Sequence, residues 1–187
     1  DTLGRVVSHK LADVLGRTIV IDNRPGAAGV IGAEIVAKVP SDGYTLLIGG
    51  PGQFGIIENV RANVPYDSIR DFAPVSLISR VPYLLVISPA LPAVSLKEFI
   101  GLARSKTRRL NYASSGAGSV PHLAVELFKL MAGVDLFHVP YKATSVAIVD
   151  LMSGQVQMTI SPAPTVLPYV RASKIKALAV ASATRSS

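Results

Sequence analysis

A loop rich in glycine and serine is the first feature of this 187-residue sequence that could do chemistry. It covers residues 114–119, where a strand pattern ends and a helical pattern begins. Ser119 is a candidate N-cap, Pro121 suits the first turn, and that turn carries no acidic residue. Free N–H groups at such a helix start can bind an anion, and glycines let the backbone approach it closely. The pattern predicts an anion site, although an ordinary βα loop would look the same.

Two further loops also follow predicted strands. Gly49-Gly50-Pro51-Gly52-Gln53 follows the strand expected at 44–48, and Ser161-Pro162 follows the one expected at 156–160. In open α/β sheets, ligands bind beyond the carboxyl ends of the strands. Gly50 and Pro51 could therefore face a ligand or form a plain tight turn. Ser161 could direct its hydroxyl at a ligand or cap the next helix.

The three histidines form no recognisable catalytic pattern. His122 lies three residues after Ser119 and seven after Ser115, a spacing that needs a third orienting group before it indicates a nucleophile and base. We expect His122 to be a surface or hydrogen-bonded histidine, His9 to be exposed and His138 to be structural. The sequence has no cysteine and no His, Asp or Glu cluster with metal-ligand spacing. The dinucleotide-binding fingerprint is also absent, so no metal and no cofactor are expected.

Charge and composition narrow the class of protein. The chain is 49% hydrophobic and 17% charged, which is typical of a globular core, and its net charge is +7. The densest basic group, Arg104, Lys106, Arg108 and Arg109, lies at a predicted helix end, where positive charge complements the helix dipole. Aromatic residues make up only 6% of the chain, which disfavours a nucleic-acid surface. The longest apolar run, at 81–94, is too short and too rich in proline to span a membrane.

Helical and strand patterns alternate along the chain, which predicts βαβ units on a parallel sheet. In the first unit, helices are expected at 6–15, ended by Gly16, and at 29–39. Strands are expected at 18–21 and 44–48, and two successive strands at 75–79 and 83–88 lead to a proline-rich crossing.

The second unit repeats the alternation and gives a hinge architecture with two crossings. Its expected helices cover 96–105, 120–132, 145–152 and 165–172, and its expected strands cover 110–113, 136–139, 156–160 and 175–181. Ser95 with Glu98 predicts a capping box, and Gly133 a helix end. On the helix at 120–132, Leu123, Leu127, Leu130 and Met131 are expected to be buried, and His122, Glu126 and Lys129 to lie opposite. The predicted domains are 1–88 with 176–187, and 89–175.

The ordered set of motifs resembles the receptors of tripartite tricarboxylate transporters, also called the Bug or TctC family. The resemblance covers essentially the whole chain. It is carried by Asn23-Arg24-Pro25-Gly26, Asp42-Gly43-Tyr44-Thr45-Leu46-Leu47, Tyr66-Asp67, Asp71-Phe72-Ala73-Pro74-Val75, Asn111-Tyr112-Ala113-Ser114-Ser115-Gly116, His122-Leu123-Ala124, Glu126-Leu127-Phe128-Lys129, His138-Val139-Pro140-Tyr141-Lys142, Gly154-Gln155-Val156 and Lys176-Ala177-Leu178-Ala179-Val180.

This resemblance implies an α/β fold of the type II periplasmic-binding class, with two domains joined by crossing strands. It implies a periplasmic, monomeric receptor, not an enzyme, that captures a small carboxylate such as a di- or tricarboxylate or an aromatic acid. The receptor would deliver it to the permease subunits of the transporter, and no nucleic acid is expected as a partner. The ligand-binding positions implied are Gly50, Pro51, Ser115, Gly116, Gly118, Ser119, His122 and Ser161, and Asp1 matches an acidic residue after the family's first Gly-rich loop.

The sequence also departs from the family pattern. Ala143 replaces a usual glycine, and Ser161 replaces the aspartate that many members use to contact a ligand amino group. The second change makes an amino-acid ligand less expected than a plain carboxylate. Because the family's first strand precedes Asp1 and its members continue past Ser187, the chain is expected to be truncated at both ends.

Two other functions remain open from the residues alone. A hydrolytic α/β enzyme could use Ser115 or Ser119 as nucleophile, which requires a base such as His122 within hydrogen-bond reach. A basic nucleic-acid-binding domain would show an affinity that falls steeply with salt.

Overall fold

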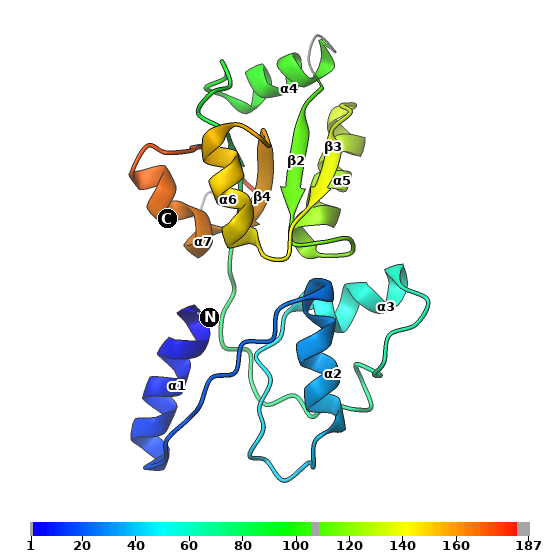
Figure 1. The fold of residues 1–187 in the computed structure, drawn as a ribbon, viewed down its shortest axis with the longest axis vertical. Helices are drawn as coiled ribbons and strands as arrows, with labels where there is room; N and C mark the ends of the chain where they lie inside the picture. Colours follow the sequence, from blue (N-terminus) through cyan, green and yellow to red (C-terminus); the bar gives the residue numbers. More distant parts are fainter. Residues whose placement is uncertain (1, 106–108, 183–187) are drawn as a thin grey trace.

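A computed structural model of the chain describes residues 2–105 and 109–182. Figure 1 shows two lobes joined by extended chain, with the strands and four helices in the upper lobe and three helices in the lower one. The lower lobe holds α1 (Thr2–Leu15), α2 (Val30–Lys38) and α3 (Ile57–Val60). Two short turns accompany these helices, a 3₁₀ turn at Ala27–Gly29 (η1) and a π-helical turn at Gly52–Ile56 (η2).

The upper lobe is built on a five-stranded mixed sheet with the order β3-β2-β4-β1-β5. Strand β2 (Asn111–Ser114) lies between β3 (Phe137–Pro140) and β4 (Met158–Pro162) and runs parallel to both. Strand β1 (Tyr83–Ile87) is antiparallel to both β4 and β5 (Lys176–Val180). The expected common direction therefore holds for β2, β3, β4 and β5, and β1 alone of these five strands runs the other way. Strand β1 arrives from the lower lobe without a preceding crossover helix, so it is free to do so.

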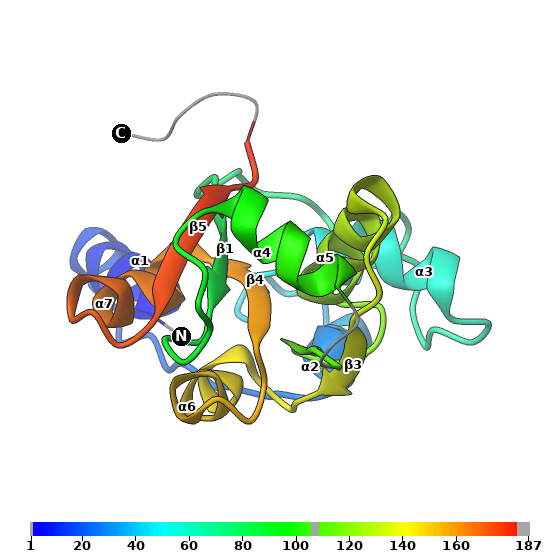
Figure 2. The ribbon, with the colours of Figure 1, turned by 90° about the horizontal axis from the view of Figure 1, so that it is seen from above.

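Helices cover both faces of this sheet. On one face, α4 (Leu96–Arg104) and α5 (Val120–Ala132) pack on Leu85, Ile87 and Tyr112. On the other, α6 (Thr144–Ser153) and α7 (Ala163–Arg171) pack on Val86 and Ala113. Figure 2 shows α4 and α5 on one side of the strands and α6 on the other. Successive strand residues thus enter opposite cores, which is the alternation that a doubly covered sheet requires.

Local capping signals place the helix ends of the upper lobe where the sequence predicts them. The Ser95 hydroxyl accepts a hydrogen bond from the Glu98 amide at 3.2 Å, and the Glu98 carboxylate accepts one from Val94 at 2.8 Å, which confirms a capping-box type of helix start. Gly133 closes α5 and Gly154 closes α6, both with positive φ angles of 59° and 81°. Such left-handed positions favour glycine because it has no Cβ.

Three strands predicted for the first unit are wrong. The segments at 18–21, 44–48 and 75–79 are extended but form no ladder, and Val20, Tyr44 and Val75 are 85%, 93% and 85% exposed. A strand is stable only when a neighbour takes up its backbone hydrogen bonds and one face is buried. Within the described part of the chain, no other segment pairs with these three.

The face that α5 presents to the sheet is also different from the prediction. Leu130 and Met131 are 81% and 79% exposed, and Leu127 is exposed as well, whereas Val125 and Ala132 are buried. The helix is rotated toward its polar stripe, where the Glu126 carboxylate accepts a hydrogen bond from the hydroxyl of buried Tyr112. A buried tyrosine hydroxyl needs such a partner, and that requirement is invisible to hydrophobic periodicity.

Both crossing segments pair with the upper sheet, as β1 and β5. The domain division at residues 88 and 176 stays a prediction. The helices of residues 2–105 and 109–182 include none with both the length and the apolar character needed to cross a bilayer.

Candidate ligand-binding cleft

A cleft of about 300 Å³ lies where the two lobes meet. Residues of both lobes line it: Gly26, Ala27, Ala28 and Arg61 from the lower lobe and Ser115, Gly116, Ala117, Pro140, Tyr141 and Lys142 from the upper lobe. The upper wall is the carboxyl-terminal edge of the parallel strands β2 and β3, which is where ligands bind in open α/β sheets. Two of the predicted binding residues, Ser115 and Gly116, are therefore in this cleft.

The cleft has an excess of positive charge. Arg61 follows α3 on the lower lobe, and Lys142 follows β3 on the upper lobe. Neither has an ion-pair partner within residues 2–105 and 109–182, and the described lining includes no Asp or Glu. Two unpaired cations in one cleft favour an anionic ligand. The basic character of the chain did not single out these two residues, because they are far apart in sequence.

The loop at 114–119 contributes backbone donors. The amides of Gly116, Gly118 and Ser119 are bonded within the loop and its helix, to Ser114 Oγ, His122 Nδ1 and the Gly116 carbonyl. In the described structure the amides of Ser115 and Ala117 have no protein acceptor. These two amides in the cleft wall can donate to a ligand oxygen.

The start of α5 differs from the sequence expectation in one respect. Its first turn carries no acidic residue, as predicted. The Ser119 hydroxyl, however, accepts a hydrogen bond from the His122 amide at 3.4 Å and donates one to the Gly116 carbonyl at 2.7 Å. Ser119 is thus a true N-cap, and it uses one of the amides that we expected to be free. The donors that lie in the cleft wall are therefore the loop amides of Ser115 and Ala117.

The lower wall is a turn at residues 26–29, which is not among the predicted ligand-binding positions. Four successive residues, Gly26, Ala27, Ala28 and Gly29, have φ angles of 130°, 48°, 58° and 94°. Left-handed alanines each cost about 1 kcal/mol, so they persist only where the surrounding structure enforces them. The Gly29 amide closes the turn on the Gly26 carbonyl at 2.9 Å. The glycines alone gave a signal of a turn, but the two alanines gave none.

The predicted turn containing Gly50 and Pro51 lies beside this wall. The Gly50 amide donates to Gln53 Oε1 at 3.0 Å, and a Cβ on Gly52 would lie 3.9 Å from the Ala28 carbonyl. The structure therefore brings this turn next to the cleft, but Gly50 and Pro51 are not among the residues that line it.

Gly118 approaches the lower lobe closely. Its φ angle is 79°, and a Cβ at this position would come within 2.8 Å of Val60 and 3.1 Å of Ile57. Glycine is required here both for the backbone conformation and for the contact between lobes.

A cluster of rings lies behind the loop. His122 Nδ1 accepts a hydrogen bond from the Gly118 amide at 3.2 Å, which confirms a hydrogen-bonded His122. His138 Nε2 lies 2.6 Å from the Ser114 hydroxyl, and the two imidazole rings are 4.4 Å apart. Tyr112 stacks on His138 with ring centroids 4.8 Å apart. Neither histidine lines the cleft.

Burial and hydrogen bonding set the ionisation of this cluster. Burial, reinforced by the Glu126 carboxylate, raises the pKa of Tyr112, which stays protonated. Burial opposes ionisation of Glu126, but the hydrogen bonds from Tyr112 and Lys129 together lower the pKa of this carboxyl below its usual value. Burial lowers the pKa of His138, and a positive His122 would lower it further. His138 is therefore neutral at neutral pH.

Tyr141 in the cleft is also held neutral. Burial and a 2.6 Å hydrogen bond to Asp150 raise the pKa of its hydroxyl to about 12. Its hydroxyl proton is donated to Asp150, so the phenol oxygen is available to a ligand only as an acceptor.

Ser161 does not have the capping role considered from sequence. It lies fully buried in β4, and its hydroxyl is 3.0 Å from that of Thr159. The residue at the N-cap position of α7 is Pro162, which has no side-chain hydrogen bond to offer. The described lining of the cleft does not include Ser161.

The contacts between serine and histidine side chains are not those that the hydrolase hypothesis requires. Ser119 contacts the backbone amide of His122 and not its ring. The serine that meets an imidazole is Ser114, which is buried and therefore out of reach of a substrate. Among the residues that the structure describes, no three His, Asp or Glu side chains are grouped to hold a metal.

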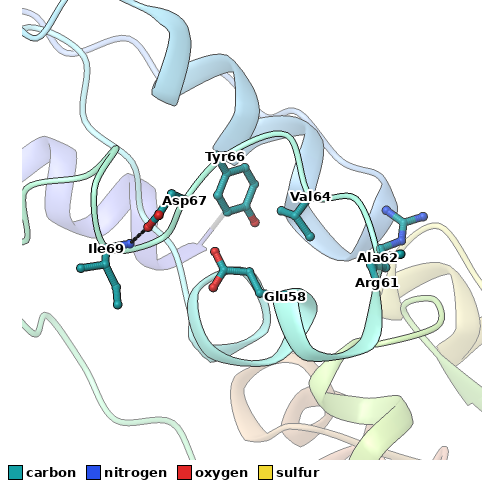
Figure 3. A pocket seen from close by; sticks show the side chains of 7 residues that line it. All are labelled: Glu58, Arg61, Ala62, Val64, Tyr66, Asp67 and Ile69. Atoms are coloured by element: carbon teal, nitrogen blue, oxygen red, sulfur yellow. Dashed lines mark hydrogen bonds between the residues drawn. The ribbon is translucent and has the colours of Figure 1, made fainter.

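A second hollow, of about 380 Å³, lies beyond α3 on the lower lobe (Figure 3). Its two carboxylates already have partners: Glu58 accepts from the Ser68 amide at 2.8 Å and Asp67 from the Ile69 amide at 2.9 Å. The hydrogen bonds from the Ile69 and Arg70 amides lower the pKa of Asp67. Arg61 lines this hollow as well as the cleft, so it joins the two.

Two members of the basic group at the end of α4, Arg104 and Arg109, make structural contacts within the upper lobe. Arg104 donates to the Ala132 carbonyl at 2.6 and 3.0 Å, and Arg109 lies 4.2 Å over the ring of Phe137. Lys106 and Arg108 lie outside the described residues, as does Asp1.

Comparison with known proteins places the chain among binding proteins. Residues 3–187 match the profile of the Tripartite tricarboxylate transporter family receptor. Protein BugT of Bordetella pertussis is 38% identical over 189 residues, which cover all of this chain and 57% of BugT. A structure from R. palustris with adipate has a TM-score of 0.96 and 43% identity, and covers 99% of this chain and 62% of that one. MatC from Rhodopseudomonas palustris with bound malate has a TM-score of 0.91 and 34% identity, with coverage of 99% and 63%.

These similarities confirm the predicted fold class, an α/β fold of the type II periplasmic-binding kind. The chain spans a little more than half of the curated relatives that it matches.

Proposed function

The chain belongs to the tripartite tricarboxylate transporter receptor family, and on that premise we propose that the protein binds a small carboxylate in the cleft between its lobes. The observation that carries this proposal is the pairing of Arg61 and Lys142, one from each lobe, in a cleft whose described lining has no acidic residue. A carboxylate between them would join the lobes through two charge-assisted hydrogen bonds.

The loop at 114–119 supplies the remaining recognition in this proposal. Its free amides at Ser115 and Ala117 and the Ser115 hydroxyl would receive a carboxylate oxygen. Such donors recognise any carboxylate, so the rest of the ligand is read by the other lining residues. Gly116 and Gly118 permit the close backbone approach, and Ser119 and His122 hold the loop. Gly50 and Pro51 stay in the proposal as residues of the turn beside the cleft. Ser161 stays in it as a buried residue that does not line the cleft.

The ligand class follows from the charges and from the relatives. Solved relatives contain adipate and malate, which are both dicarboxylates. A ligand with two carboxylates, or with a third, would engage both cations, whereas an aromatic acid would engage one. No carboxylate lines the described part of the cleft to receive a ligand amino group, in agreement with serine at position 161. We therefore expect di- and tricarboxylates to bind more tightly than amino acids.

The protein would act as a receptor and not as an enzyme. In the proposed cycle it closes over the carboxylate in the periplasm, as a monomer, and delivers it unchanged to the permease subunits of a tripartite tricarboxylate transporter. The extended chain between the lobes, at 73–82, would allow this hinge motion.

Thermal denaturation of the natural full-length protein tests the proposal. A ligand that binds only the folded state raises the melting temperature, and at a hundred times Kd the gain is about 2.7 kcal/mol. We expect a rise with at least one member of a panel of di-, tri- and aromatic carboxylates, including adipate and malate. Recovery of the bound compound by mass spectrometry should show it chemically unchanged. A panel without any shift would reject carboxylate binding, and a converted product would reject the receptor role.

A further inference from the structure

The loop at 114–119 is attached at both ends to an imidazole ring. Near its end, the Gly118 amide donates to His122 Nδ1 at 3.2 Å. At its start, the Ser114 hydroxyl lies 2.6 Å from His138 Nε2. The segment that lines the cleft lies between these two attachments, and neither ring lines the cleft itself. The two rings are 4.4 Å apart, so they form one support behind the wall.

We propose that His122 and His138 are positioning residues that hold this loop in its ligand-binding conformation, and that protonation of His122 releases the loop and weakens binding. The proposal rests on the proposed carboxylate-binding function and adds a pH dependence to it. It assigns no contact between either histidine and the ligand.

The chemistry of imidazole gives the sign of the effect. A ring nitrogen can accept a hydrogen bond only while it carries no proton, and both nitrogens of a charged imidazole are donors. Protonated His122 would therefore set a donor against the Gly118 amide, which is itself a donor. The attachment is present while Nδ1 of His122 carries no proton, and it is lost when a proton binds there. Histidine is the side chain whose ordinary charge change lies nearest to neutral pH.

The neighbouring groups decide which histidine takes the proton. His138 from β3 is buried, which lowers its pKa, and a second positive ring at 4.4 Å would be repelled. Burial and this repulsion both disfavour a proton on His138.

Three other groups face the pair, and their charges do not change in this range. Tyr112 from β2 stacks on His138 and stays protonated, because burial raises its pKa. Glu126 and Lys129 from α5 are 2.9 Å apart and largely cancel each other. Glu126 stays ionised because its pKa is lowered by its hydrogen bonds, despite its partial burial. None of these three groups therefore adds a charge change of its own near neutral pH.

A competing effect has the opposite sign. A positive His122 would attract an anionic ligand through space and raise its affinity at low pH. The ring does not line the cleft, and salt screens its field at a ligand. Loss of loop positioning should therefore dominate, and the direction of the pH dependence distinguishes the two effects.

The test is calorimetric titration of the natural full-length protein with adipate between pH 7.5 and 6.0. His122→Asn places an amide oxygen where Nδ1 lies, accepts from the same backbone amide and cannot be protonated there. As the pH falls from 7.5 to 6.0, the affinity of the unmodified protein for adipate should decrease more than that of this variant. The difference between the two decreases should be about three- to tenfold, which corresponds to the loss of one hydrogen bond. The protonation of adipate is common to both proteins and cancels.

Two further variants complete the set. His122→Ala should bind more weakly at every pH, and His122→Asn should recover most of that loss. His9→Ala removes an exposed histidine that pairs only with Asp13 in the described structure, so it should keep the unmodified pH profile. Equal profiles for the unmodified protein and His122→Asn would overturn the proposal, as would an affinity that rises on acidification relative to that variant.

A ligand-free measurement keeps this test separate from the proposed function. The Gly118 amide resonance should shift with the protonation of His122 in the unmodified protein and stay constant in His122→Asn. If adipate does not bind at any pH but this resonance titrates, the choice of ligand has failed and the loop attachment stands. If the resonance does not titrate, the proposal is wrong whatever the ligand.

Discussion

At the scale of residues, Arg61 and Lys142 set the character of the cleft. They come from different lobes, and neither is neutralised by a carboxylate within the described residues. A cation left unpaired at a concave surface keeps its field available to a ligand, whereas the arginine of a salt bridge does not. This is the physical basis for expecting an anion here and not on the basic end of α4, where Arg104 is bonded to a carbonyl.

Replacing these cations gives a direct prediction. Arg61→Ala and Lys142→Ala should each raise the Kd for the bound carboxylate about tenfold, because each removes a hydrogen bond to a charged group. Isothermal titration would measure the change, and the affinity should depend less on salt in both variants. Lys174→Ala is the matched control, since it removes an exposed lysine that is not in the cleft. Unchanged affinity in both cleft variants would place the ligand elsewhere.

At the scale of elements, α5 shows how a polar contact can determine which face of a helix is buried. The apolar residues of this helix form a broad stripe, and sequence periodicity alone chooses its centre near Leu127. In the structure the helix buries Pro121, Val125 and Ala132 instead. Its Glu126 then reaches the hydroxyl of Tyr112 in β2. The same rotation places His122 over the loop that it supports.

The orientation of α5 can be tested by paired substitutions. Val125→Ala should lower the free energy of unfolding by about 2 kcal/mol, because it leaves a cavity in the buried core. Leu130→Ala removes more side chain but should cost less than about 0.5 kcal/mol, since Leu130 is exposed. Chemical denaturation of the two variants measures both values. A larger loss of stability for Leu130→Ala than for Val125→Ala would mean that α5 buries the face predicted from periodicity.

At the scale of the whole molecule, the two lobes differ in how well they are supported. The upper lobe has a sheet with a hydrophobic core on each face. The lower lobe has one small cluster around Val30, Ala33, Ile57 and Tyr66, and its extended segments are exposed. The lobes come close at Gly118, where an added Cβ would lie 2.8 Å from Val60. Two unequal lobes joined by extended chain are an arrangement in which relative motion is expected.

Closure of the hinge is measurable in solution. Small-angle X-ray scattering of the natural full-length protein should show a smaller radius of gyration when the carboxylate is present, because the ligand joins cations on opposite lobes. Gly118→Val serves as the matched variant, since a side chain there would collide with Val60. It should bind more weakly and close less. An unchanged radius in the unmodified protein at saturating ligand would contradict closure.

The sequence by itself determined the local features of this protein. Capping and glycine signals located α4 and α5 to within a residue, because a helix end depends on neighbours in the chain. The ordered motifs identified the family, and the Gly/Ser loop identified one wall of the cleft. These are properties of consecutive residues, so no tertiary information was needed.

Only the tertiary structure decided how distant residues combine. It showed that the segments at 18–21, 44–48 and 75–79 lack strand partners among the described residues, which propensity cannot reveal. It brought Arg61 and Lys142, far apart in the chain, to one cleft, and joined His122 and His138 behind the loop. The reason is physical: pairing, burial and charge compensation depend on which surfaces meet, and the order of residues along the chain states this only indirectly.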